Sequence, residues 1–478
     1  MTLKASGKTL HYHLIGIAGT AMASLAGLLK QAGHRVTGSD ENVYPPMSDE
    51  LQSMGIEYAI GYKPENLDSS PDVVVVGNAI SRGNAELESA LERKLYYTSA
   101  AATIKEEFIR GKHSIAVAGT HGKTSTTSLL AWTLECAGKN PSFLIGGVAE
   151  NFGKSYRLTD SDLFVIEADE YDTAYFDKGP KMWHYLPDTA IVNNIEFDHA
   201  DIYRDEEAYN FAFARFINLI PGNGQLIAGW DSPLVRSLAA KSFAPVQYFS
   251  YDGEAPLEEG KGWTASNVSF GEDGTRFTVI RDGMEWGVLQ MPMTGAFSVR
   301  NALAVIAAAT AVGAEHAGIS EAFRSYKSVK RRMEVRGEAG GVLVIDDFAH
   351  HPTAVRETMA AIRQKYAGRR VIAIFEPRSY TAQRREFQKD YEQALSSADE
   401  IVFGGLFHPE RYTKETAIDP HALVGSWRAA GIAAEHIADP DEIVEYLRPR
   451  LKARDVVLVM TNGGFGGIHG KLLKALSN

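Results

Sequence analysis

The chain has 478 residues, of which 45% are hydrophobic and 23% are charged, and its formal net charge is −11. This length is too great for one compact core and predicts about three domains of ordinary globular composition. Negative charge spread along the chain disfavours nucleic-acid binding. The single cysteine, Cys136, excludes an internal disulfide, and no apolar run approaches the roughly 20 residues of a membrane helix. With no export signal at residues 1–19, we expect a cytoplasmic protein without a membrane partner.

The first segment, residues 1–110, begins with a βαβ pattern. The strand-like run HYHLIGIAG at residues 11–19 leads into the helical pattern TAMASLAGLLKQAG at 20–33, and HRVTGSD at 34–40 is typical of a second strand. Four valines at 73–76 predict a parallel strand that is buried on both faces. We therefore expect a Rossmann-like α/β domain.

The second segment, residues 111–330, again opens with a strand, a glycine loop and a helix, and we expect a central phosphate-loop (P-loop) ATPase domain. The turn-rich, alternating stretch from about Gln225 to Gly287 predicts a small antiparallel portion, and residues 294–313 predict a helix. The segment has two places where chemistry is expected.

The first place is the glycine loop, which follows an apolar strand and precedes a helix. Glycines let backbone N–H groups turn toward phosphate oxygens, Lys123 adds a full positive charge, and the Thr124 hydroxyl is suited to Mg²⁺. The loop departs from the general P-loop spacing because Val117 stands where the first glycine is expected. The expected nucleotide contacts are Gly119, Thr120, His121, Gly122, Lys123, Thr124 and Ser125.

The second place is formed by acidic strand ends. Glu167 belongs to the run EADE, and His199 lies in NNIEFDHAD. A cation bound to nucleotide phosphates needs one or two carboxylates, so Glu167 is the first choice for a magnesium ligand, and His199 is a less usual ligand for a second ion. The alternative, acids that face solvent or cap the next helix, stays open.

The third segment, residues 331–478, repeats the α/β alternation and predicts a second Rossmann-like domain. In VIDDFAHHPT, Pro352 is expected to open a helix and the preceding turn to face outward. His350 and His351 are adjacent, but no cysteine and no HxxxH spacing indicates a structural zinc site, so polar contacts to a nucleotide are expected.

The order of GTHGKTSTT, EADE, NNIEFDHAD, SVRNALAV and DDFAHHPT resembles that of the Mur ligase family of peptidoglycan synthesis, over essentially the whole chain. The resemblance implies ATP- and Mg²⁺-dependent formation of an amide bond through an acyl phosphate. GSDENVYPPMS, VGNAISRGN, FEPRS and TNGGFGGIHGKLL are similar to the branch that recycles peptidoglycan peptides. That branch joins the lactyl carboxylate of UDP-N-acetylmuramate to the amine of the murein tripeptide, L-Ala-γ-D-Glu-meso-diaminopimelate.

The resemblance also implies roles for individual residues. Lys123, Glu167 and His199 would be catalytic, and Thr124, Glu167 and His199 would hold the metal. Asn301 matches an adenine contact, and Arg332 and Asp347 match further nucleotide contacts. The first segment would bind the UDP-sugar, and the third would bind the incoming peptide. The expected substrate contacts are Gly16, Ala18, Gly19, Thr20, Asp40, His351 and Arg378.

Three alternatives remain at this point. The family's biosynthetic enzyme adds free L-alanine to the same UDP-sugar, and Arg378 is the feature that favours a peptide carboxylate instead. An NAD-dependent oxidoreductase would explain the βαβ unit with Asp40 but leaves the phosphate loop unexplained. A non-catalytic nucleotide-binding regulator would not need Lys123, Glu167 and His199 together. The sequence predicts no oligomeric state.

Overall fold

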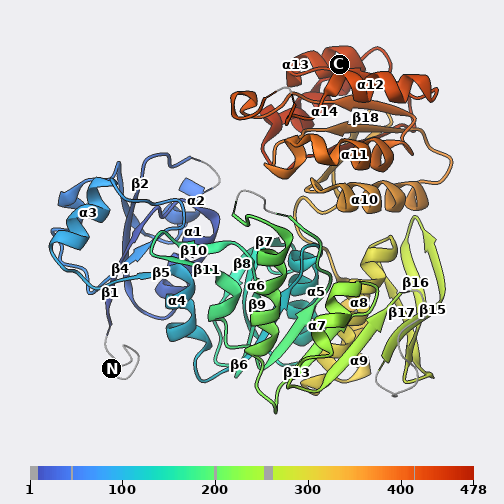
Figure 1. The fold of residues 1–478 in the computed structure, drawn as a ribbon. Coiled ribbons are helices and arrows are strands. Elements are labelled where there is room, and N and C mark those ends of the chain that lie inside the picture. The colour runs from blue at the N-terminus through green and yellow to red at the C-terminus, as the bar shows by residue number, and fades with distance from the viewer. Residues whose placement is uncertain (1–8, 45–46, 199–201, 252–261, 414, 478) are drawn as a thin grey trace.

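The structure is a computed structural model that describes residues 9–44, 47–198, 202–251, 262–413 and 415–477. Figure 1 shows three α/β portions in chain order, coloured blue, green to yellow, and orange to red. The predicted three-part α/β architecture is confirmed. Where each domain begins and ends stays a prediction.

The first portion is built on a parallel sheet with the strand order β3-β2-β1-β4-β5. All four valines of β4 are buried, as predicted, because both faces of the sheet are covered: Val73 and Val75 pack into one core cluster and Val74 and Val76 into another. The strands are β1 (His11–Ile15), β2 (Arg35–Asp40), β3 (Glu57–Ile60), β4 (Val73–Val76) and β5 (Tyr97–Ser99), and the α-helices are α1 (Thr20–Gln31), α2 (Met47–Ser53), α3 (Ala85–Glu92) and α4 (Ala100–Ile104).

The middle portion contains a long mixed sheet with the order β17-β16-β15-β14-β13-β12-β6-β9-β7-β8. Its strands are β6 (His113–Ala118), β7 (Ser142–Ala149), β8 (Lys154–Arg157), β9 (Leu163–Glu167), β12 (Thr189–Val192), β13 (Gln225–Gly229), β14 (Val246–Ser250), β15 (Gly262–Gly271), β16 (Gly274–Arg281) and β17 (Met284–Met291). A separate hairpin pairs β10 (Asp172–Ala174) with β11 (Asp177–Pro180). The helices are α5 (Lys123–Cys136), α6 (Glu206–Asn218), α7 (Pro233–Ala239), α8 (Ala296–Ala311) and α9 (His316–Ser325).

The antiparallel portion was predicted to begin at about Gln225, but it begins later in the chain, at β15. Strands β13 and β14 pair in parallel, and β14 also pairs in parallel with β15. Only β15, β16 and β17 form the antiparallel meander. Helix α7 lies between β13 and β14, so the chain returns by a crossover that makes parallel pairing possible.

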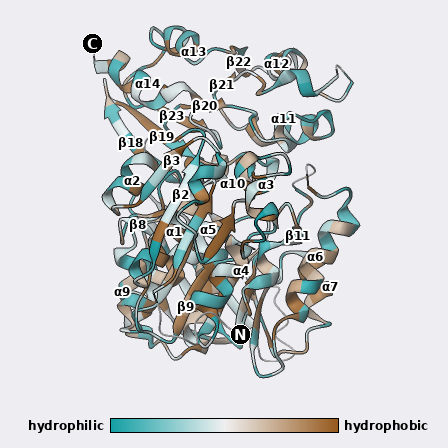
Figure 2. Cartoon of the chain, turned by 90° about the vertical axis from the view of Figure 1, so that its left-hand side faces the viewer, coloured by the Kyte–Doolittle hydropathy of each residue, from teal (hydrophilic) through white to brown (hydrophobic). Residues whose placement is uncertain are grey.

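The predicted helix at residues 294–313 is confirmed as α8, most of which is buried. Its alanine-rich sequence exposes little polar surface on any face, which suits a helix covered on all sides. It packs on α5 and beside β13 and β14. Brown strands lie inside the middle portion in Figure 2, and the outer helices carry teal residues.

The third portion has the sheet order β18-β19-β23-β20-β21-β22, in which only β18 runs antiparallel to its neighbour. Its strands are β18 (Glu334–Ala339), β19 (Val342–Asp347), β20 (Val371–Phe375), β21 (Glu400–Phe403), β22 (Ala433–His436) and β23 (Val456–Met460). The helices are α10 (Pro352–Lys365), α11 (Gln388–Leu395), α12 (Pro420–Ala429), α13 (Pro440–Leu447) and α14 (Ile468–Ser477). Pro352 opens α10 as predicted.

Side chains join the portions. The Tyr156 ring of β8 lies against Gly27 of α1, where an added Cβ would come within 2.1 Å of the ring. On the other side of the middle portion, the Thr381 hydroxyl donates a hydrogen bond of 2.6 Å to the buried carboxylate of Asp198. Among the described residues, no helix is long and apolar enough to cross a membrane.

Candidate active site

The residues expected to carry chemistry lie at the carboxyl ends of parallel strands. The glycine loop follows β6, Glu167 ends β9, and Asn193 and Asn194 follow β12. These three strands are neighbours in the sheet, with β6 in the centre, so their carboxyl ends meet at one edge. Ligands bind at such an edge in open α/β sheets.

The glycine loop is held open by the segment after β12. The Asn194 side chain accepts a hydrogen bond of 2.8 Å from the His121 backbone N–H. The Thr120 hydroxyl donates to the Glu196 carbonyl and accepts from the Glu196 N–H, both at 2.9 Å. Gly122 caps α5 with a φ of 82°, a conformation that favours glycine. The loop is therefore preorganised at the helix N-terminus, where anions bind.

Lys123 is held by Glu170. The two carboxylate oxygens of Glu170, which is fully buried, lie 2.9 and 2.8 Å from Lys123 Nζ. The same ammonium donates hydrogen bonds of 2.7 Å to the Gly119 carbonyl and 3.2 Å to the Thr120 carbonyl. Burial lowers the pKa of Lys123, but the Glu170 charge opposes it and the pKa ends above its ordinary value. Lys123 is therefore charged and folded back over its own loop.

Glu167 and Thr124 form an oxygen-rich pair. The Thr124 hydroxyl donates a hydrogen bond of 3.0 Å to one Glu167 oxygen, and the Gly146 N–H donates one of 2.8 Å to the other. Burial raises the pKa of Glu167 above its ordinary value, although the charge of Lys123 and these two hydrogen bonds lower it. A carboxylate and a hydroxyl beside a phosphate loop match the oxygen ligands that Mg²⁺ prefers, so the residues present fit this ion.

The third portion reaches into the same place. The Arg332 guanidinium donates a hydrogen bond of 3.4 Å to the Thr124 hydroxyl. Asp347 accepts 2.8 Å hydrogen bonds from the backbone N–H groups of Met333 and Ala349, and burial raises its pKa while Arg332 opposes the shift. The expectation that the turn before α10 faces outward was wrong: Ala349 and His351 of this turn are buried, as are Asp346 and Asp347 at the end of β19. The turn packs against the middle portion, a contact that local sequence cannot reveal.

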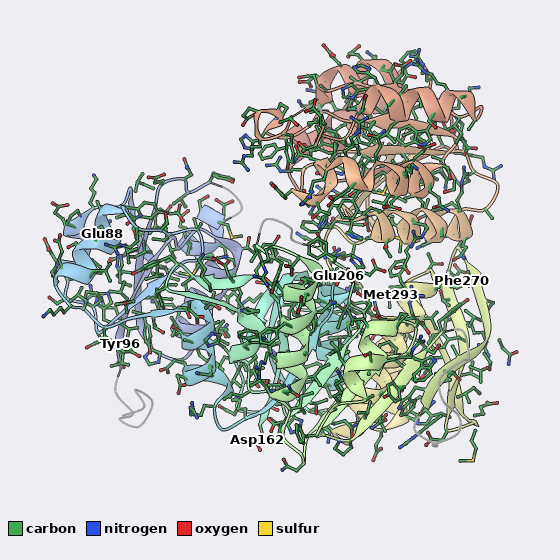
Figure 3. The ribbon with its side chains drawn as sticks, viewed as in Figure 1. Glu88, Tyr96, Asp162, Glu206, Phe270 and Met293 are labelled. Atoms are coloured by element: carbon green, nitrogen blue, oxygen red, sulfur yellow. The ribbon has the colours of Figure 1, made fainter. Side chains whose placement is uncertain are left out.

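A first cavity, with a volume of about 110 Å³, lies between the middle and third portions. Met293, labelled in Figure 3, lies at the end of the middle portion that faces the third and lines this cavity. The predicted contacts that line it are His121, Gly122, Ser125, Asn301, Arg332 and Asp347.

A second, wider cavity adjoins all three portions. It contains Thr20 from the start of α1, the glycine loop, and polar side chains of the third portion. His121, Gly122 and Arg332 line both cavities, so the two meet at the phosphate loop. The predicted residues that line the second cavity are Thr20, Thr120, His121, Gly122, Lys123, Thr124, Glu167, Arg332 and His351.

In the first portion, Asp40 at the end of β2 contacts the turn that precedes α1. Its carboxylate accepts hydrogen bonds of 2.9 Å from the Ala18 N–H and 3.5 Å from the Tyr62 hydroxyl. The Gly16 N–H donates to the Ser39 carbonyl, and Gly16 has a φ of 84°. Asp40 therefore shapes the turn that contains Gly16, Ala18, Gly19 and Thr20.

Some of the predicted residues that the structure describes line neither cavity: Gly16, Ala18, Gly19, Asp40, Gly119 and Arg378. The Arg378 guanidinium stacks on the Phe407 ring at 4.0 Å from its centroid and lies 3.8 Å from Glu376. It is at the carboxyl end of β20, on the same sheet edge as Asp347. His199 lies outside the described residues, so its predicted role as a metal ligand stays a prediction.

Sequence reasoning did not assign roles to four residues of this site. Asn193 and Asn194 follow a predicted strand as a pair of amides, which was an available signal for bracing of the loop. Glu170 belongs to the acidic run EADE, but its pairing with Lys123, like that of Glu196 with His121, could not be read from the sequence because these partners lie far away in the chain, at the phosphate loop.

Three family models cover most of the chain. They are described as Mur ligase family, catalytic domain (residues 11–110), Mur ligase middle domain (117–309) and Mur ligase, glutamate ligase domain (331–463). The chain is also 41% identical over 469 residues to UDP-N-acetylmuramate–L-alanyl-γ-D-glutamyl-meso-2,6-diaminoheptandioate ligase of Escherichia coli (strain K12), covering 97% of this chain and 98% of that one. The chain belongs to the Mur ligase family.

Two further members of the family match nearly the full length of the chain. A UDP-N-acetylmuramate–L-alanine ligase of Burkholderia thailandensis is 33% identical over 469 residues, 97% of each chain. The crystal structure of a murein peptide ligase from Psychrobacter arcticus 273-4 matches with a TM-score of 0.72 and 37% identity, covering 98% of this chain and 99% of that one. The similarity to Mur ligases thus extends over all three portions.

Proposed function

We propose that this protein joins the lactyl carboxylate of UDP-N-acetylmuramate to the α-amine of L-Ala-γ-D-Glu-meso-diaminopimelate, with ATP converted to ADP and phosphate. The observation that carries the proposal is 41% identity, over almost the full length, to a ligase named for these substrates. The identity to an L-alanine ligase, over a similar length, is 33%. The product would serve peptidoglycan recycling in the cytoplasm, where ATP is available.

The reaction needs a phosphoryl group to pass from ATP to the carboxylate, and positioning with charge neutralisation supplies most of the catalysis in such transfers. The loop from Gly119 to Ser125 would hold the phosphates. Lys123 would neutralise the transferring group once its ammonium moves from the loop carbonyls to the phosphate. Arg332, which already reaches Thr124, would add a second positive charge from the third portion.

Mg²⁺ would be held by Thr124 and Glu167, and by His199 in the part of the chain that the structure does not describe. When bound, the ion would supply charge neutralisation of the phosphate oxygens. Glu167 is kept in place by the Gly146 N–H, which leaves the Thr124 hydrogen bond to be exchanged for the ion.

The first cavity suits the nucleoside end of ATP. Asn301 would contact adenine, and Arg332 and Asp347 would complete the nucleotide site between residues 111–330 and 331–478. The resulting acyl phosphate would face the second cavity, where the amine attacks the carbonyl carbon and phosphate leaves.

The remaining substrate contacts are proposals for the outer domains. Residues 1–110 would bind the UDP-sugar through Gly16, Ala18, Gly19, Thr20 and Asp40. Residues 331–478 would bind the peptide, with His351 near the reacting end and Arg378 pairing with a peptide carboxylate.

Phosphate release tests the proposal. The protein is given ATP, Mg²⁺ and UDP-N-acetylmuramate with either the tripeptide or free L-alanine. Turnover with the tripeptide and little with L-alanine is expected. Turnover with L-alanine alone would make this the biosynthetic enzyme, and no release with either amine would refute the ligase proposal. A Lys123→Met variant serves as the inactive control.

A further inference from the structure

A cluster of two histidines and one glutamate lies where the third portion meets the phosphate loop. His121 belongs to the loop, Glu196 follows β12, and His351 caps α10. One ligand atom from each side chain lies within 4.8 Å of those of the other two. The adjacent histidines of the sequence are thus separated: His351 joins this cluster, whereas His350 bonds to the Phe348 carbonyl at 3.0 Å.

The distances within the cluster suit a small cation. One oxygen of Glu196 lies 3.1 Å from His121 Nε2 and 3.8 Å from His351 Nδ1. Ligand atoms at the corners of a tetrahedral zinc site are about 3.3 Å apart, given zinc–ligand bonds of about 2.0 to 2.1 Å. Side-chain shifts of less than an ångström would therefore give three ligands around one ion.

Hydrogen bonds satisfy His351 poorly. It is buried, with 7% of its surface exposed, and its Nε2 has no hydrogen-bond partner among the residues that the structure describes. Its Nδ1 accepts only a long contact of 3.4 Å from the Thr353 N–H. The imidazole rings of His121 and His351 lie 4.7 Å apart, measured between their centroids. Packing, rather than hydrogen bonding, holds this ring beside the carboxylate.

The charge around the cluster also favours a cation. Glu196 offers a carboxylate, and the buried Asp198 adds negative charge near His351.

We propose that His121, Glu196 and His351 form a site for a divalent transition metal of the zinc class, distinct from the magnesium site at Thr124 and Glu167. Nitrogen ligands select zinc-like ions over Mg²⁺, which prefers oxygen. Three protein ligands leave one tetrahedral position open. Because His121 and Glu196 come from the middle portion and His351 from the third, the ion would tie these two portions together at the phosphate loop.

Cobalt binding tests the site directly. The full-length protein is freed of metal with a chelator, kept in excess Mg²⁺ to fill oxygen sites, and titrated with Co²⁺ while the visible d–d absorption is recorded. One Co²⁺ per chain with a tetrahedral spectrum, displaced by Zn²⁺, is expected. His351→Gln should weaken binding by about 100-fold or more, since even removal of outer-sphere partners costs about 10- to 100-fold.

His350→Gln is the matched control, because it changes the neighbouring histidine outside the cluster and should bind Co²⁺ as the wild type does. His121→Gln and Glu196→Gln should each reproduce the loss. If either disturbs folding, as judged by thermal unfolding, His351→Gln still decides the question because it lies outside the loop. Equal Co²⁺ affinity in the wild type and His351→Gln, or no tetrahedral spectrum in the wild type, would overturn the proposal.

Discussion

The buried pair of Lys123 and Glu170 gives the sharpest stability prediction. Replacing Glu170 by Gln keeps the shape of the side chain but removes the negative charge that faces the Lys123 ammonium at 2.8 Å. Breaking a buried ion pair by removing one partner costs about 3–5 kcal/mol. Lys123 keeps the Gly119 and Thr120 carbonyls as acceptors, so we expect the lower end, about 3 kcal/mol.

Differential scanning calorimetry is the appropriate assay, because a chain with three portions need not unfold in one step. For a unit of 150–250 residues, each kcal/mol lowers Tm by about 2–4 °C. The transition of the middle portion should therefore fall by about 6–12 °C in Glu170→Gln, while the other transitions move little.

The pH dependence of this loss follows from the pKa of Lys123, which is raised in the folded state. A raised folded pKa contributes stability that is fully present below the unfolded value, about 10.4, and is lost as the pH rises through the folded one. The gap between wild type and Glu170→Gln should therefore be constant from pH 7 to 9 and shrink at higher pH.

A double-mutant cycle with Lys123→Met separates this pairing from general damage to the core. Once Lys123 is absent, Glu170→Gln should cost less by at least about 1 kcal/mol, as expected for side chains in direct contact. Additive effects within about 0.5 kcal/mol would refute the reasoning.

Three further variants test the proposed substrate sites. Gly122→Ala places a Cβ 2.7 Å from Asn301 Oδ1 at a φ of 82°, so calorimetric titration should give a weaker affinity for ADP by about tenfold or more. Gly138→Ala has a similar φ of 72° in open space and should lose only stability; equal ADP affinities in the two would contradict this account. Asn301→Ala should lower the affinity for ADP about tenfold, because a hydrogen bond is lost, and should leave the KM for the UDP-sugar unchanged. A change in the KM for the UDP-sugar alone would argue against an adenine contact. Arg378→Lys, which gives up the guanidinium geometry and the stacking on Phe407, should raise the KM for the tripeptide about tenfold with little change in kcat, and an unaltered KM would remove Arg378 from the peptide site.

Local sequence determined much of the fold. The glycine loop between an apolar strand and a helix lies at the start of α5. The valine run of β4 is buried on both faces, and Pro352 opens α10. Each of these features depends on residues that are close in the chain, where spacing, glycine conformation and the missing N–H of proline decide the outcome. The antiparallel meander was placed too early because alternation does not reveal whether a crossover helix separates two strands.

Contacts between distant segments were decided only by the tertiary structure. Lys123 meets Glu170 because β6 and β9 are neighbours in the sheet. His351 meets His121 and Glu196 because the third portion packs against the phosphate loop, which also buries a turn that its own sequence suggested would face solvent. The sequence supplied the chemical groups, but the order of strands and the contact between portions chose their partners, since neither is encoded in the spacing of nearby residues.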